Sequence, residues 1–202
     1  MEPRNRLRTR TSRVVRKATI ALSIAAALWT VVHRRADAVG SWRPSTLPRR
    51  RIGAVSCRVG GTGPSNVLLL HGLVATGDVF GRTADQLAAF RSVAVPDLLG
   101  FGRSLDEDRD DFGTTAHLAA LDAVVAEAAG DERLLIAAHS MGSTLAMRWA
   151  CLHPDRVERV VCLGPPIWPS RTAARAAIGH ANPMARAFVL DREFNLVVDG
   201  SQ

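Results

Sequence analysis

The stretch Ala138-His139-Ser140-Met141-Gly142 holds a serine between two small residues, at a spacing that nucleophilic chemistry uses. A short apolar run precedes it and a helix-like run follows it. At a tight turn from a strand into a helix, a serine stands exposed, and the residues two positions away on either side must be small. The N-terminus of the following helix favours negative charge that develops near the serine oxygen. The spacing therefore predicts Ser140 as a nucleophile, against the alternative of a loop serine that caps a helix.

A second motif, His71-Gly72-Leu73, directly follows the apolar run 66–70. A backbone amide at this point could lie opposite the serine turn and complete an oxyanion hole, which stabilises a developing negative charge by hydrogen bonds. The predicted donors are the amides of Leu73 and Met141. We interpret His71 as a residue that holds the loop in shape rather than as a general base.

A third motif begins at Asp97 and runs through Gly100 and Gly102 to Ser104. The glycines allow a tight turn after a strand. Asp97 has the right chemistry for the acid of a catalytic triad. We instead expect it to fix the loop by accepting hydrogen bonds from nearby backbone amides.

The elements that must position these motifs alternate from Arg51 onward between strand-like and helix-like segments. Strands are predicted at 51–61, 66–72, 133–140 and 156–166 and at the start of 91–104, and helices within 76–90 and at 114–130 and 142–154. Strands separated by helices require crossover connections. The pattern predicts an α/β fold with a mostly parallel sheet and helices on both faces.

Four segments in this order and spacing, VLLLHG, VPDLLGFGRS, AHSMGS and HPDRVERVVCLGPP, resemble the α/β-hydrolase superfamily. They look most like its single-domain esterase and lipase-like members with a lid, and the resemblance covers residues 51 to about 190. It implies that Ser140 attacks the carbonyl of a small-molecule ester or related acyl substrate, with Leu73 and Met141 as backbone donors. His71, Gly72, Ala138, His139 and Gly142 would shape the turn and loop. No metal or organic cofactor is implied.

The same resemblance places the triad acid and histidine after later strands, beyond the lid. None of the 6 histidines falls in a loop after a late strand. We therefore interpret the C-terminal part of the fold as incomplete and the sequence as truncated before both residues, which leaves activity of the 202-residue form open. The alternatives are a non-catalytic ligand-binding protein of the same fold, or a haloperoxidase-like or carbon–carbon bond hydrolase that uses the same serine.

Charge is spread unevenly along the chain. Residues 1–51 hold 13 of the 26 basic residues and 2 acidic ones, whereas the remainder holds 13 basic and 17 acidic residues. The mildly acidic remainder gives no electrostatic argument for binding nucleic acid. Of the 3 cysteines, Cys151 and Cys162 lie in apolar runs and are expected to be small buried hydrophobes.

The uncharged segment 18–32 has three interpretations. It is predicted to be a single membrane anchor; the alternatives are a signal peptide cleaved near Ala36-Asp37-Ala38, which would give a secreted protein, and a helix packed on the domain. Seven basic residues precede it and six follow, so the orientation is undetermined. The predicted organisation is a basic segment with anchor and linker (1–50), a hydrolase core (51–166) and the start of a helical cap (167–202).

Overall fold

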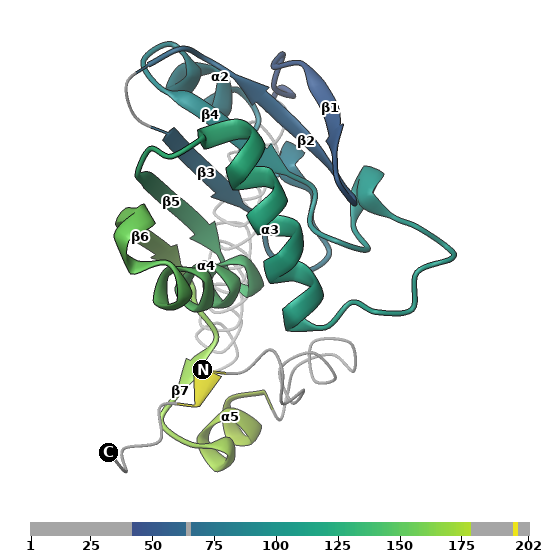
Figure 1. Cartoon of the computed structure of the whole chain (residues 1–202). Helices are drawn as coiled ribbons and strands as arrows, with labels where there is room; N and C mark the ends of the chain where they lie inside the picture. The colour runs from purple at the N-terminus through teal and green to yellow at the C-terminus, as the bar shows by residue number, and fades with distance from the viewer. Residues whose placement is uncertain (1–41, 64–65, 179–195, 198–202) are drawn as a thin grey trace, which may run out of the picture. The chain divides into compact units, whose positions relative to one another are not determined.

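The computed structural model describes residues 42–63, 66–178 and 196–197, and its centre is a six-stranded mixed sheet (Figure 1). The strands lie in the order β1-β2-β4-β3-β5-β6. Their bounds are β1 Arg49–Ile52, β2 Val55–Gly60, β3 Asn66–Leu70, β4 Ser92–Pro96, β5 Leu134–His139 and β6 Val157–Leu163. The pairs β1/β2 and β2/β4 are antiparallel, whereas β3/β4, β3/β5 and β5/β6 are parallel. The expected mostly parallel sheet is confirmed.

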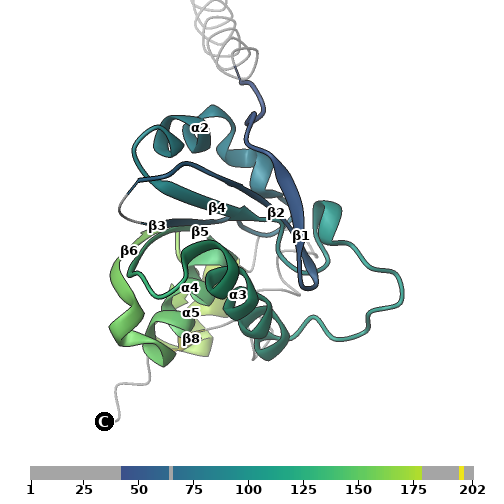
Figure 2. The same ribbon diagram turned by 45° about the horizontal axis from the view of Figure 1, so that its top comes forward.

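Helices cover both faces of this sheet, as predicted (Figure 2). Helix α2 (Arg82–Ala88) lies on one face, and α3 (Thr114–Ala129) and α4 (Met141–Leu152) lie on the other. Short 3-10 turns η1 (Gly77–Phe80), η2 (Gly102–Ser104) and η3 (Pro154–Arg156) complete the connections. Pro154 ends the predicted helix, since η3 begins there.

The two hydrophobic cores follow from the alternation of side chains along the central strand. All five residues of β3 are buried. Leu68 and Leu70 join the core under α3 and α4, where Leu121, Leu145 and Trp149 are almost fully buried. Val67 and Leu69 belong to the second core, which Ala84 of α2 closes on the other face. A continuous apolar run is what a strand covered on both faces requires.

Three details differ from the sequence prediction. The predicted strand 51–61 is a hairpin, because a turn at Gly53, with φ 54°, reverses the chain between β1 and β2. The sequence predicts one apolar face of the helix at Leu118, Leu121, Val125 and Ala128; in α3, Leu121 and Val125 are buried together with His117 and Val124, whereas Leu118 and Ala128 are half-buried. Cys151 is exposed, so its assignment as a buried hydrophobe is wrong; Cys57 is the buried cysteine.

Outside the sheet, the described part of the C-terminal region holds β7 (Ile167–Trp168), α5 (Arg171–Ile178) and β8 (Leu196–Val197), and β7 pairs with β8 in parallel. The predicted anchor at 18–32 and most of the predicted cap lie outside the described residues. Among the helices that are described, none has the length and apolar character needed to cross a membrane.

The chain divides into two units at Arg43/Pro44, and residues 44–48 of the predicted linker belong with the sheet. There, the backbone amide of Thr46 donates to Asp85 at 2.8 Å.

Candidate active site

Two of the predicted motifs meet because their strands are neighbours. β3 and β5 are parallel, and Leu70 stands opposite Ala138 in the register. Gly72 and Ser140 therefore leave the same edge of the sheet side by side. The order of the strands reverses here: β4, which follows β3 in the chain, lies on one side of β3, and β5, which follows α3, lies on the other side. In open α/β sheets, ligands bind in the crevice at such a switch point.

Ser140 occupies the turn between β5 and α4 in a conformation that non-glycine residues rarely adopt. Its φ is 51° and its ψ is −119°. Its amide donates to the carbonyl of Leu163 on β6 at 2.9 Å, and its own carbonyl accepts from the amide of Ser143 at 2.9 Å. Such a backbone costs about 1–3 kcal/mol and persists where the surrounding structure enforces it. The side chain is half-buried at the first turn of α4, whose leading amides have no acceptor within the helix.

Two glycines allow this turn to approach β3. A Cβ on Gly142 would lie 2.5 Å from the carbonyl oxygen of His71 and 2.7 Å from that of Leu70. A Cβ on Gly72 would lie 2.9 Å from the Cβ of Ser140 and 2.8 Å from Nδ1 of His139. The requirement for a small residue two positions after the serine thus has a direct steric cause. Ala138, two positions before it, is 1% exposed between β3 and β6.

His71 is fully buried and joins the loops that follow β3 and β4. Its Nε2 accepts a hydrogen bond from the amide of Leu98 at 2.9 Å, so Nδ1 carries the proton and donates to the carbonyl of Gly72 at 2.7 Å. Burial lowers the pKa of the ring. The neutral ring also packs edge-on against Phe101, with centroids 5.6 Å apart. With both nitrogens engaged, His71 acts in the structure as a fixed link between loops.

The loop after β3 contains a second strained residue. Leu73 is half-buried against the main core, and Val74 beside it has φ 55° with a side chain that is 70% exposed. Positive φ is a marked outlier for a β-branched residue. Within the part of the chain that the structure describes, Val74 and Ser140 are the only non-glycine residues with positive φ. Backbone strain of this kind concentrates at functional sites.

Asp97 directly follows β4 and fixes its own loop by accepting from a backbone amide, as predicted; it also holds the loop that leads into η1. Its side chain is 1% exposed. Oδ1 accepts from the amide of Gly77 at 2.8 Å, and Oδ2 accepts from the amide of Arg103 at 3.0 Å. Oδ2 also pairs with the guanidinium of Arg49 at 2.8 Å. Arg49 could not be identified from the sequence, because nothing in the run Arg49-Arg50-Arg51 indicates which arginine pairs with Asp97.

The structure brings Gly72, Ser140 and Gly142 together, with Leu73 in the adjoining loop and Met141 as the first residue of α4. His139 is exposed beside Gly72. Over residues 42–63, 66–178 and 196–197, no side chain forms a hydrogen bond with the Ser140 hydroxyl. A base for this serine is therefore not among its described contacts.

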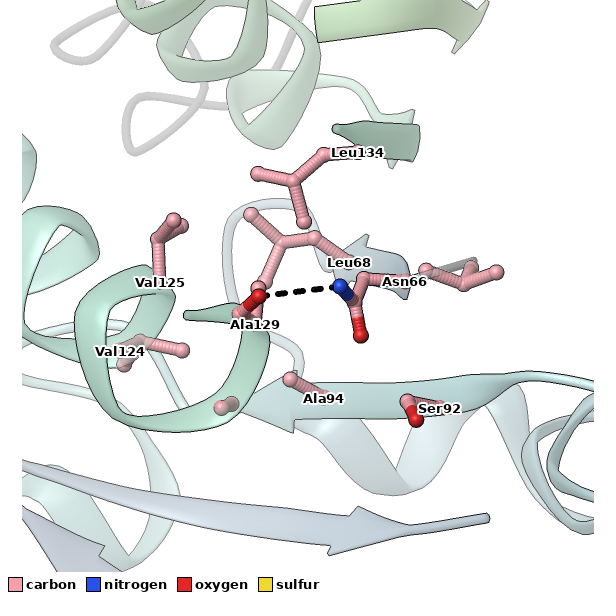
Figure 3. A pocket seen from close by; sticks show the side chains of 10 residues that line it. Asn66, Leu68, Ser92, Ala94, Val124, Val125, Ala129 and Leu134 are labelled. Carbon is pink, nitrogen blue, oxygen red and sulfur yellow. Dashed lines mark hydrogen bonds between the residues drawn. The ribbon is translucent and has the colours of Figure 1, made fainter. Parts of the chain in front are cut away.

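A small cavity lies elsewhere, at the amino ends of the strands (Figure 3). Asn66, Ser92, Val124 and Leu134 are among its lining residues, and Asn66 spans it to donate to the carbonyl of Ala129 at 3.1 Å. It has room for about one water molecule and is too small for a substrate.

Comparison with known proteins agrees with this architecture. The family model described as alpha/beta hydrolase fold matches residues 66–193. The chain is 36% identical over 110 residues to lipase LipV of Mycobacterium tuberculosis, covering 54% of this chain and 41% of that protein. It is 38% identical over 99 residues to a pimeloyl-[acyl-carrier protein] methyl ester esterase of Chromobacterium violaceum, covering 48% of this chain and 35% of the esterase.

A solved structure, the thioesterase domain from the curacin biosynthetic pathway, superposes with a TM-score of 0.54 at 28% identity. The superposition covers 65% of this chain and 50% of that chain. The matches thus span half or less of each of these relatives' length. The chain belongs to the α/β-hydrolase fold family.

Proposed function

We propose that this protein is a serine hydrolase that acts on an ester or related acyl substrate through Ser140. The observation that carries the proposal is the strained turn at Ser140, with φ 51°, packed against Gly72 at the switch point of the sheet. Strained backbone conformations persist where the surrounding structure enforces them, and they cluster at functional sites. A strained turn from a strand into a helix is the geometry that exposes a nucleophilic serine.

In this mechanism the Ser140 oxygen attacks the substrate carbonyl and forms an acyl-enzyme, and the alcohol or thiol leaves with a proton. Water then attacks the acyl-enzyme and releases the acid. The amides of Leu73 and Met141 would stabilise the oxyanion in both steps, an effect worth about 10²–10³ in rate for each donor. The lipase and esterase names of the two curated relatives support an ester substrate.

The alternative is a non-catalytic ligand-binding protein with the same fold. It is favoured by one observation: no described side chain forms a hydrogen bond with the Ser140 hydroxyl. Without a base, a serine hydroxyl is a weak nucleophile. The two proposals therefore differ in the reactivity of Ser140.

An alkyl fluorophosphonate, which modifies activated serines, distinguishes the two proposals. The matched control is Ser170→Ala, which removes an exposed serine that caps α5 at Ala173. We expect labelling of the wild-type chain and of Ser170→Ala, and loss of labelling in Ser140→Ala. Labelling that survives in Ser140→Ala would reject Ser140 as the nucleophile. A folded wild-type chain that binds acyl ligands without being labelled would favour the binding protein.

A further inference from the structure

The loop 71–77, which contains Leu73 and the strained Val74, is held at both ends by one dipeptide after β4. At its start, the amide of Leu98 donates to Nε2 of His71 at 2.9 Å. At its end, the amide of Gly77 donates to Oδ1 of Asp97 at 2.8 Å. The adjacent residues Asp97 and Leu98 thus form a clamp that fixes the span of the loop between them.

This clamp depends on a buried carboxylate. Asp97 is 1% exposed, and an ionised carboxylate at that depth needs compensating charge and hydrogen bonds. Among the described residues, Arg49 of β1 is the cation that pairs with it, from a side chain that is 10% exposed. A second nitrogen of the same guanidinium contacts Asp78 of η1 at 3.0 Å. Arg49 therefore links β1 to both the clamp and the turn that follows the loop.

We propose that Arg49 is a positioning residue for the reaction at Ser140: by holding Asp97 it fixes both ends of the loop 71–77 and thereby the Leu73 amide. This inference rests on the proposed function. The contact between loop and nucleophile is close, since a Cβ on Gly72 would stand 2.9 Å from the Cβ of Ser140. A loosened loop therefore changes the geometry at the serine itself.

The expected kinetic effect depends on the step at which the Leu73 amide binds the oxyanion. An oxyanion donor acts on charge that exists only in the transition state, so its displacement lowers kcat and leaves KM nearly unchanged. A misplacement of about 1 Å can cost on the order of 10² in rate. For a loosened clamp we expect at least about 10-fold slower acylation of Ser140.

The structure supplies a matched control in Arg58 of β2. Its side chain is 15% exposed, and its Nε pairs with the same Asp78 oxygen at 2.8 Å. Arg49→Met and Arg58→Met each remove one ion pair to Asp78, but only the first removes the partner of Asp97. Arg49→Lys keeps the charge and loses the two-pronged guanidinium that reaches both carboxylates.

The test measures two properties of the full chain. Hydrogen exchange of the Gly77 and Leu98 amides reports on the clamp without requiring activity, and the rate of fluorophosphonate labelling reports on Ser140. We expect Arg49→Met to speed exchange of both amides and to slow labelling, each about 10-fold or more, while Arg58→Met matches the wild type in both. Arg49→Lys should be intermediate, and it carries the test if Arg49→Met does not fold.

The outcomes separate the two proposals. Normal exchange and labelling in the folded Arg49 variants, or equal effects in Arg58→Met, would overturn the positioning role and leave the hydrolase proposal intact. Faster exchange in Arg49→Met together with an unlabelled wild-type chain would reject the hydrolase proposal and retain the clamp as a structural feature alone. Coupled changes in exchange and labelling, restricted to the Arg49 variants, support the inference.

Discussion

Replacing Gly142 with alanine tests the steric basis of the site. The added Cβ would lie 2.5 Å from the His71 carbonyl oxygen, 2.7 Å from the Leu70 oxygen and 2.9 Å from the Leu70 carbonyl carbon. All three atoms belong to backbone, so no side chain can rotate away. Because close carbon–oxygen contacts lie at about 3.3 Å, the first turn of α4 and the end of β3 must separate by about 0.8 Å.

Two energetic effects oppose each other in this variant. Alanine is favoured over glycine within a helix by about 0.5–1 kcal/mol. Overpacking against rigid groups costs typically about 1–3 kcal/mol. The clash should prevail, with a net loss of about 1–2 kcal/mol in the free energy of unfolding. Because Ser140 begins the turn that moves, we expect its acylation to slow by up to about 10².

The assay combines urea unfolding with the rate of fluorophosphonate labelling. Gly130→Ala is the control, because Gly130 also lies at a helix end but has open space around its Cβ position and φ 54°. It should cost about 1–2 kcal/mol through backbone strain and leave labelling unchanged. A Gly142→Ala variant with wild-type labelling and stability would refute the steric account of the turn.

Two further predictions concern the core. Burial lowers the pKa of His117 from 6.5 to about 4. Between these pH values the unfolded chain binds a proton at this histidine and the folded chain does not. The free energy of unfolding should therefore fall by on the order of 3 kcal/mol as the pH drops from about 6.5 towards about 4. Urea titrations should show a smaller fall over this pH range in His117→Leu. The same dependence on pH in wild type and variant would contradict this role of His117. Asn66→Ala removes the hydrogen bond to the Ala129 carbonyl and should cost about 1–2 kcal/mol in the same titration at neutral pH, with labelling of Ser140 unchanged. If Asn66→Ala lost labelling at unchanged stability, the cavity that Asn66 lines would be coupled to the geometry at Ser140.

The parallel part of the sheet was predictable because its strands are short apolar runs that glycine or a turn closes. β3 is the clearest case, since a strand buried on both faces must be apolar throughout. The hairpin of β1 and β2 was not. β1 reads Arg49-Arg50-Arg51-Ile52. Arg49 and Arg50 pair with carboxylates far along the chain, Asp97 and Glu127, whereas Arg51 donates to the nearby carbonyl of Ala54. No local pattern encodes such pairings.

The spacing of the serine motif gave the position of Ser140 and the need for a small residue at Gly142. The pairing of Arg49 with Asp97 could not be predicted, because the two residues are 48 positions apart and meet only when β1 folds beside β2. The positive φ of Val74 could not be predicted either, because valine does not favour that backbone conformation.

Whether Ser140 is the nucleophile can be tested by looking for the acyl-enzyme itself. The full chain would be mixed with a p-nitrophenyl ester, quenched in acid and digested, and the peptides would be mapped by mass spectrometry. If Ser140 is the nucleophile, we expect it to be acylated with release of p-nitrophenol, and we expect no adduct in Ser140→Ala. No acyl adduct on a folded chain, or an adduct on another residue, would contradict this role of Ser140.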